Sequence, residues 1–131
     1  MVCLQDAPGD KADFNLDLFV PKGVTSLGVG ERYASLDAFD GLAMHRYRSV
    51  RPLSPYLFAF AAGDYPEETV STPQGILHYL NATGEPADLS DLFAQTPAMV
   101  AFLADRAGIG LPGRSYAQLL VPHREAQETA D

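Results

Sequence analysis

The sequence predicts a mainly β protein, in which an antiparallel β-sandwich is followed by a helix and a strand. Two observations lead to this prediction. From about residue 12 to residue 83, short segments of alternating apolar and polar residues are separated by Gly, Pro and Asp, which is typical of antiparallel sheets. After residue 84 the apolar residues recur at helical spacing, and a strand-like segment follows at 116–122. The short, closely spaced strands favour a sandwich over a βαβ arrangement.

The first expected strand covers residues 14–20, FNLDLFV, and Pro-Lys-Gly at 21–23 ends it. Phe14, Leu16 and Leu18 share one face of this segment. Because successive side chains of a strand point to opposite faces, the segment is expected to be half buried. Four later segments show related patterns and are also expected to be strands: 24–29, 42–50, 55–63 and 75–82.

Within SPYLFAFAAGDYPEE, residues 54–68, an almost unbroken apolar run ends at Gly63. In a strand, Tyr56, Phe58 and Phe60 would share one face, with smaller side chains on the other. Burying a large apolar side chain is worth about 1.5–3 kcal/mol, so these three rings are predicted to lie in the core. The run is therefore predicted to be a strand covered on both faces, whose exit leads toward a domain junction.

The second part of the chain has helical character. Residues 83–86, Thr-Gly-Glu-Pro, are expected to form a linker. Thr96 and Pro97 allow two interpretations: Thr96 caps a second helix that begins with Pro97, or Pro97 kinks one longer helix. We expect a kinked or two-piece helix that ends near Gly108. The apolar residues at helical spacing are Leu89, Leu92, Phe93, Met99, Val100 and Leu103.

The composition places the chain among globular proteins, with 47% hydrophobic and 20% charged residues. The formal net charge is −8, the pI is about 4.6, and the nine basic residues are scattered. Nucleic-acid binding requires a surface rich in Lys and Arg. We therefore expect no nucleic-acid partner, and the acidic excess is expected to be solvated surface.

The single cysteine, Cys3, excludes an intrachain disulfide and fits a reducing compartment such as the cytoplasm. No apolar run approaches the roughly 18 to 20 residues of a membrane span. No basic segment followed by an apolar one opens the chain. The expected protein is soluble, with no membrane span and no export signal of its own.

Near its beginning the chain carries a recognisable motif. The segment CLQDAPGDKADFNLDLFVP, residues 3–21, resembles the C-x-D-x-P-x-x-K-A-x-F segment and following strand of the aminopeptidase N family of zinc peptidases. The matching residues are Cys3, Asp6, Pro8, Lys11, Ala12 and Phe14.

Two later segments resemble the same family, in the same order along the chain. SPYLFAFAAGDY, residues 54–65, is similar to the end of the family's first β domain. LFAQTPAMVAFLADRAGIGLPGRSYAQLLVP, residues 92–122, is similar to the start of its catalytic domain. There Tyr116 and Gln118 match the end of the turn that leads into a strand.

The resemblance implies a specific domain organisation. Residues 1–84 would be the C-terminal part of an incomplete β-sandwich N-terminal domain. Residues 85–131 would be the first helix and strand of a truncated, thermolysin-like α/β catalytic domain. The resemblance further implies an intact protein that binds zinc and removes amino acids from peptide N-termini. The chain itself is then expected to be a non-catalytic fragment.

In the family, a Gly-Ala-Met-Glu-Asn element follows the strand, and its glutamate binds the substrate's free α-amino group. The aligned residues here are 125–129, Glu-Ala-Gln-Glu-Thr. The resemblance implies that Glu128, with Ala126 and Gln127 beside it, contacts the substrate in the intact protein. Glu125 in place of glycine restricts the backbone and adds a negative charge.

A catalytic zinc site of this family needs His-Glu-x-x-His on a helix and a later glutamate. The 131 residues contain no such motif. The three histidines, His45, His78 and His123, lie in separate strand-like segments, where packing or surface roles are more common than metal binding. We therefore predict no catalytic residue, no metal ligand and no cofactor in this chain, and we assign zinc to the intact protein.

Two functions stay open. One is a zinc aminopeptidase-like protein, to which this chain contributes scaffold and the first edge of the substrate cleft. The other is a stand-alone or degenerate β-rich binding or interaction module without peptidase activity. The ordered match along the chain favours the first, and the altered residues at 125–129 favour the second.

Overall fold

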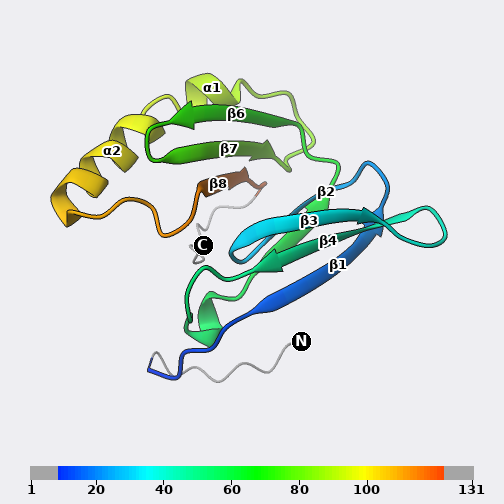
Figure 1. Ribbon diagram of the computed structural model, residues 1–131. Helices are drawn as coiled ribbons and strands as arrows, with labels where there is room; N and C mark the ends of the chain where they lie inside the picture. Colours follow the sequence, from blue (N-terminus) through cyan, green and yellow to red (C-terminus); the bar gives the residue numbers. More distant parts are fainter. Residues whose placement is uncertain (1–8, 123–131) are drawn as a thin grey trace. The chain divides into compact units, whose positions relative to one another are not determined.

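The computed structural model describes residues 9–122. These residues form two compact units, 9–63 and 64–122, which divide after Gly63. In the described range, two sheets belong to the first unit, and one sheet and both α-helices belong to the second (Figure 1). The predicted mainly β class, with antiparallel sheets and then a helix and a strand, is confirmed.

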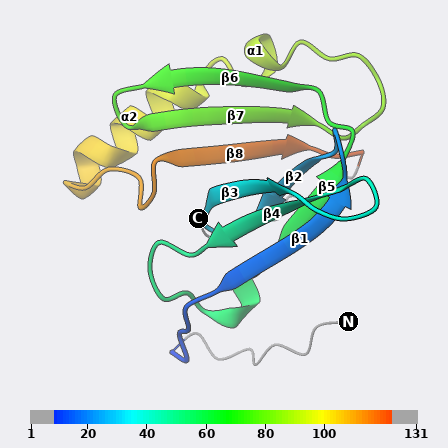
Figure 2. The ribbon, with the colours of Figure 1, turned by 45° about the vertical axis from the view of Figure 1, so that its right-hand side comes forward.

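Two antiparallel sheets build the first unit (Figure 2). One sheet has the strand order β1-β4-β3, and the other pairs β2 with β5. The strands are β1 (Asn15–Pro21), β2 (Thr25–Gly28), β3 (Glu31–Asp37), β4 (Leu42–Arg48) and β5 (Phe60–Gly63). All of these except β3 overlap segments that the sequence predicts to be strands.

The two sheets of the first unit meet at Tyr47 of β4, whose side chain is buried. Gly28 of β2 approaches this ring so closely that a Cβ atom there would lie 2.8 Å from the ring Cγ. Gly30, in the turn after β2, has a φ of +81°, a conformation that other residues rarely adopt. Glycine at these two positions permits the close approach and the turn.

The prediction for the apolar run is wrong in its first half. Pro55–Leu57 is a 3-10 helix (η1), and only Phe60–Gly63 is a strand. Proline supplies the helical φ for this turn, and the Phe58 N–H donates to the Pro55 carbonyl. The strand β5 keeps only four residues, which pair with β2. The predicted burial of the rings also fails at two positions, because too little packs against them: Phe60 is 56% exposed, and Tyr56 on η1 is 48% exposed.

Two strands lack an apolar signature in the sequence. They are β3, ERYASLD, and β6 (Glu67–Thr72), EETVST. Each lies at an edge of a three-stranded sheet in the described chain. An edge strand can keep most of its side chains in water, so its sequence need not alternate between apolar and polar residues.

The second unit consists of one three-stranded sheet and two helices. The sheet order is β6-β7-β8, with β7 at Gly75–Asn81 and β8 at Ser115–Leu120. The β6–β7 pair is antiparallel and the β7–β8 pair is parallel. A parallel pair requires a crossover connection, and the helices supply it here. Their bounds are α1, Leu89–Leu92, and α2, Thr96–Ala107.

The core of the second unit lies between this sheet and its helices. Leu77 and Tyr79 of β7 pack with Leu89 of α1 and Val100 of α2. The ring of Phe93 contacts that of Tyr79, with centroids 5.0 Å apart. The helices therefore cover the face of the sheet to which Leu77 and Tyr79 point (Figure 2).

The two-piece helix is confirmed. Asp88 caps α1, because its carboxylate accepts the Asp91 N–H at 3.0 Å. Pro97 is the second residue of α2, where a missing N–H costs nothing. Gly108 follows α2 with a φ of +70° and ends it.

The units divide after Gly63, so the boundary predicted between residues 84 and 85 falls inside the second unit. The reason is that β7 and β8, on either side of that boundary, pair in one sheet. The predicted linker, 83–86, is a turn organised by the buried Asn81. Its amide donates to the Glu85 carbonyl at 2.8 Å, and its Oδ1 accepts the Thr83 N–H at 2.9 Å.

Candidate functional site

The substrate-binding residues predicted from the sequence, Glu128, Ala126 and Gln127, lie outside the described residues. Cys3 and His123 lie outside them as well. Among residues 9–122, no group of three or more His, Cys, Asp or Glu side chains is placed to hold a metal ion. No helix of that range is long and apolar enough to cross a membrane.

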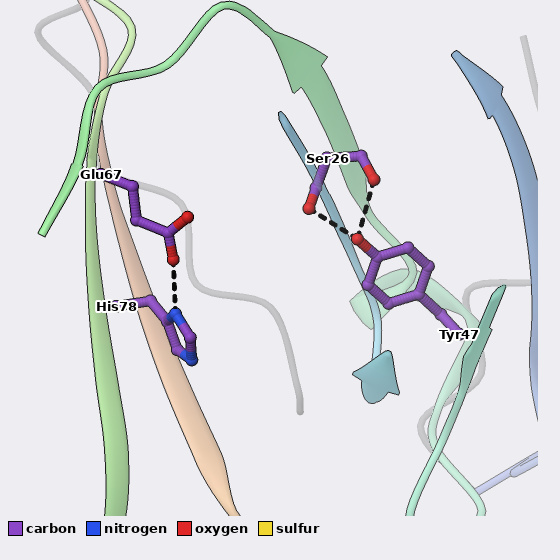
Figure 3. Close-up of polar contacts among 4 residues, drawn as sticks. All are labelled: Ser26, Tyr47, Glu67 and His78. Carbon is purple, nitrogen blue, oxygen red and sulfur yellow. Dashed lines mark hydrogen bonds and ion pairs between the residues drawn. The ribbon is translucent and has the colours of Figure 1, made fainter. Parts of the chain in front are cut away.

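The first polar cluster joins the two sheets of the first unit. Ser26 of β2 lies between His45 and Tyr47 of β4. The Ser26 Oγ is 2.6 Å from the His45 Nδ1 and 2.8 Å from the Tyr47 hydroxyl. The Tyr47 hydroxyl also donates to the Ser26 carbonyl at 2.6 Å (Figure 3). All three side chains are buried.

Counting protons fixes the direction of these hydrogen bonds. The single proton of the Tyr47 hydroxyl is used on the Ser26 carbonyl, which can only accept. The Ser26 hydroxyl must then donate to the Tyr47 oxygen, so the His45 Nδ1 must donate to the Ser26 Oγ. The neutral imidazole therefore carries its proton on Nδ1.

This cluster is not a nucleophile with its base. A base must accept the serine proton, whereas the His45 Nδ1 donates to Ser26 here. Ser26 is also only 2% exposed, which leaves no room for a substrate. Burial lowers the pKa of His45 below its ordinary 6.5, and the positive charge of Arg32 lowers it further. The cluster holds a neutral histidine and positions β2 against β4.

The second polar pair lies in the second unit. The His78 Nδ1 on β7 is 2.6 Å from the Glu67 Oε1 on β6 (Figure 3). Both side chains keep about a third of their surface in water, 28% for His78 and 35% for Glu67. The pair ties the edge strand β6 to the central strand β7 of the sheet.

A third cluster lies on the outer face of the β1-β4-β3 sheet, and the sequence analysis missed it. The guanidinium groups of Arg46 and Arg48 lie 5.6 and 5.5 Å from the centre of the Tyr33 ring. Tyr33 sits where the β3–β4 register shifts, which is typical of a β-bulge that re-aims a side chain. A cavity of about 260 Å³ borders Tyr33 and Arg48. The sequence signal that could have indicated part of this cluster is the alternating Arg-Tyr-Arg of β4, which places both arginines on one face of the strand.

A cavity of about 600 Å³ lies within the second unit. It is open to solvent, between the β6–β7 turn at Pro73 and Gln74 and one side of α2. Asp105 is the one charged residue in its lining. Neither polar cluster of Figure 3 contributes to it.

No protein-family model matches the sequence, and no curated protein matches it either.

Proposed function

We propose that the chain is a non-catalytic part of a zinc aminopeptidase-like protein, which in its intact form removes N-terminal amino acids from peptides. In this proposal residues 9–122 act as scaffold. Glu128 receives the α-amino group of the substrate, and Ala126 and Gln127 lie along the peptide. Zinc and peptide N-termini are ligands of the intact protein.

One observation carries the proposal. The segment that resembles the start of the catalytic domain, 92–122, contains a helix beginning at Thr96-Pro97 and then a strand at Ser115–Leu120. This is the order of elements that the resemblance implies for that domain. The preceding segments, which resemble the first β domain, contribute strands of antiparallel sheets.

The side chains of residues 9–122 do not fit a catalytic zinc. His45 lies buried against Ser26, and His78 pairs with Glu67. A catalytic site needs three converging ligands and an open position. No step of catalysis is therefore assigned to these residues, and zinc chemistry belongs to a part of the intact protein outside them.

The test compares the 131-residue chain with the product of the same gene extended beyond Asp131. After dialysis, the extended protein should retain one equivalent of zinc and release the amine from aminoacyl-anilides, and the 131-residue chain should do neither. In the extended protein, Glu128→Ala should lower kcat/KM about a hundredfold, because the substrate ammonium loses its ion pair. Glu125→Ala is the matched control and should keep most of the activity.

Retained zinc or chelator-sensitive hydrolysis by the 131-residue chain alone would refute the proposal. An extended protein that neither retains zinc nor hydrolyses the anilides would refute it as well. The second outcome would favour the alternative, a β-rich binding module without peptidase activity. The cluster of Tyr33, Arg46 and Arg48 supports that alternative, since tyrosine and arginine are enriched where proteins bind partners.

A further inference from the structure

The hydrogen-bonded chain of Ser26, His45 and Tyr47 forms the polar joint between the two sheets of the first unit. The Ser26 Oγ lies 2.6 Å from the His45 Nδ1 and 2.8 Å from the Tyr47 hydroxyl. The three residues are 2%, 7% and 4% exposed, in this order. Because Nδ1 already donates to Ser26, an added proton would bind to Nε2 and turn the neutral ring into a buried cation.

This cation would meet no negative charge on the strands around it in the described chain. The residues beside His45 on these strands are uncharged: Leu18 of β1, Ser35 of β3, Ser26 of β2 and, opposite Ser26, Ala62 of β5. The Tyr47 hydroxyl keeps its proton on the Ser26 carbonyl. Arg32 of β3 acts on His45 with a positive charge. Asp37, farther along β3, has a side chain that is 82% exposed and pairs with Lys22 at 3.1 Å.

Little apolar packing holds β2 to β4 beside these hydrogen bonds. Ser26 and Gly28 are the residues of β2 that point toward β4, and Gly28 has no side chain. Their partners in β5, Ala62 and Phe60, are both exposed. A sheet of two four-residue strands is marginally stable unless it packs against another layer. The β2–β5 sheet therefore depends strongly on the hydrogen bonds of Ser26.

We propose that the joint of Ser26, His45 and Tyr47 is an acid-sensitive switch, in which proton uptake by His45 releases the β2–β5 sheet while the β1-β4-β3 sheet stays folded. Release breaks the hydrogen bonds of Ser26 but gives the imidazolium the water that the joint excludes. Val29, directly after β2, is 2% exposed and anchors the end of the released strand. The released state is a minor population that grows with acidity. This inference is independent of the peptidase proposal.

The direction of the response follows from the two states of His45. Burial and Arg32 lower the pKa of His45 in the closed joint below 6.5, whereas a hydrated imidazole has the ordinary value of about 6.5. The released state therefore binds the proton more tightly, and its population rises as the pH falls below about 6.5. One proton is bound, so the rise is at most about tenfold per pH unit, and it stops below the pKa of the closed state.

Amide hydrogen exchange of the 131-residue chain, corrected for the intrinsic rate at each pH, tests the switch. From about pH 7 to about pH 5, the protection of β2 and β5 should fall, by at most about tenfold per pH unit. These amides should exchange faster than those of β4, and about 0.5 M urea should not accelerate them, because a local opening exposes little surface.

Two histidine variants assign the response to His45. His45→Gln keeps an amide that can donate to Ser26, but it cannot titrate in this range. It should therefore remove the fall in the protection of β2 and β5. His78→Gln, on β7 of the second unit, is the matched control and should leave the fall unchanged.

Arg32→Gln gives a graded test that leaves the residues of the joint in place. Arg32 is exposed, so the variant should fold. Without this positive charge, the pKa of His45 in the closed joint moves toward 6.5, and the loss of protection on acidification should shrink. Arg51→Gln is the control, since Arg51 is also exposed in the first unit and should not affect the response.

The proposal fails if β2 and β5 keep their protection at about pH 5. It fails as well if they exchange together with β4 and with the same urea dependence, because the whole first unit then unfolds. A fall in protection that survives in His45→Gln would also refute it. Circular dichroism melts establish that each variant is folded. If His45→Gln is not, equal pH responses of Arg32→Gln and Arg51→Gln would refute the switch.

Discussion

The two units of the chain close their cores by different means. In the first, a buried hydrogen-bonded chain of His45, Ser26 and Tyr47 joins two small sheets. In the second, apolar side chains such as Leu77 and Val100 fill the space between sheet and helices. Polar networks demand fixed geometry, whereas apolar contacts have no direction. Loss of a single hydrogen-bonding atom should therefore destabilise the first unit. Loss of buried side-chain volume should destabilise the second.

The two units also differ in net charge. Residues 9–63 contain six acidic and six basic side chains, whereas residues 64–122 contain seven acidic and two basic ones. The acidic excess of the described chain thus belongs to the second unit. The net charge of the whole sequence therefore conceals that residues 9–63 carry no excess of either sign. Arg46 and Arg48, beside Tyr33, belong to this first unit.

The largest effect is expected from removing volume in the second unit. Leu77 is fully buried, so Leu77→Ala should lower the free energy of unfolding by about 2–5 kcal/mol. Hydrogen exchange should show weaker protection of β6, β7 and β8, with β1 to β4 less affected. Ile76→Ala, at a neighbouring position that is 44% exposed, should cost less than about 1 kcal/mol. An equal loss of protection in both units would contradict their separation.

A matched pair of hydroxyl deletions should give opposite results in the two units. The Tyr47 hydroxyl has hydrogen bonds to the Ser26 hydroxyl and carbonyl, so Tyr47→Phe should destabilise the protein by about 1–3 kcal/mol. The buried Tyr79 hydroxyl has no hydrogen-bond partner in the described chain. Tyr79→Phe should therefore be neutral or stabilising by up to about 1 kcal/mol. Urea denaturation measures the change in the free energy of unfolding for both variants. An equal loss of stability in Tyr47→Phe and Tyr79→Phe would contradict the prediction.

A smaller effect is expected from pH, and it should act on the first unit. Burial and Arg32 lower the pKa of His45 in the folded chain below the 6.5 of an unfolded histidine. Between these two values the unfolded state binds more protons, so stability falls as the pH falls below about 6.5. Below the pKa of His45 in the folded chain, both states bind the proton, and the stability stops falling. NMR titration of the imidazole should give a lower midpoint in the folded chain than in urea, and a higher midpoint would refute the assignment.

The smallest effect is expected from the cap of α1. Asp88→Ala removes the carboxylate that accepts the Asp91 N–H and should cost about 0.5–1 kcal/mol. Asp88→Asn keeps an acceptor and should recover most of this loss. Thermal melts measure both variants. If Asn is as costly as Ala, the hydrogen bond does not stabilise the helix.

Some elements could be predicted because their cause is local. The alternation of Leu16, Leu18 and Val20 is enough to form β1, and Gly108 is enough to end α2. The interruption before Pro97 likewise follows from the missing N–H of proline. The edge strands β3 and β6 escaped prediction because their side chains contact water, so burial left no apolar pattern in their sequences.

The candidate sites depended far more on distant contacts. His45 could be recognised as a packing residue, but its hydrogen bond to Ser26 joins residues 19 positions apart. The Arg-Tyr-Arg pattern of β4 could place Arg46 and Arg48 on one face, but it could not place Tyr33 there, because a bulge in β3, rather than strand alternation, brings Tyr33 near them. The predicted substrate residues around Glu128 lie outside the described range and stay a prediction.

The sequence by itself determined the mainly β class, most of the strands and both pieces of the helix, since periodicity and proline or glycine chemistry act over a few residues. Tertiary structure decided which apolar residues are buried. Tyr56 and Phe60 are largely exposed although they lie in the apolar run, whereas Tyr47 and Leu77 are buried. Burial depends on what packs against a side chain, and that partner comes from elsewhere in the chain. For the same reason, the parallel pairing of β7 with β8 could not be predicted from the sequence. It depends on how the helices between the two strands return the chain to the sheet.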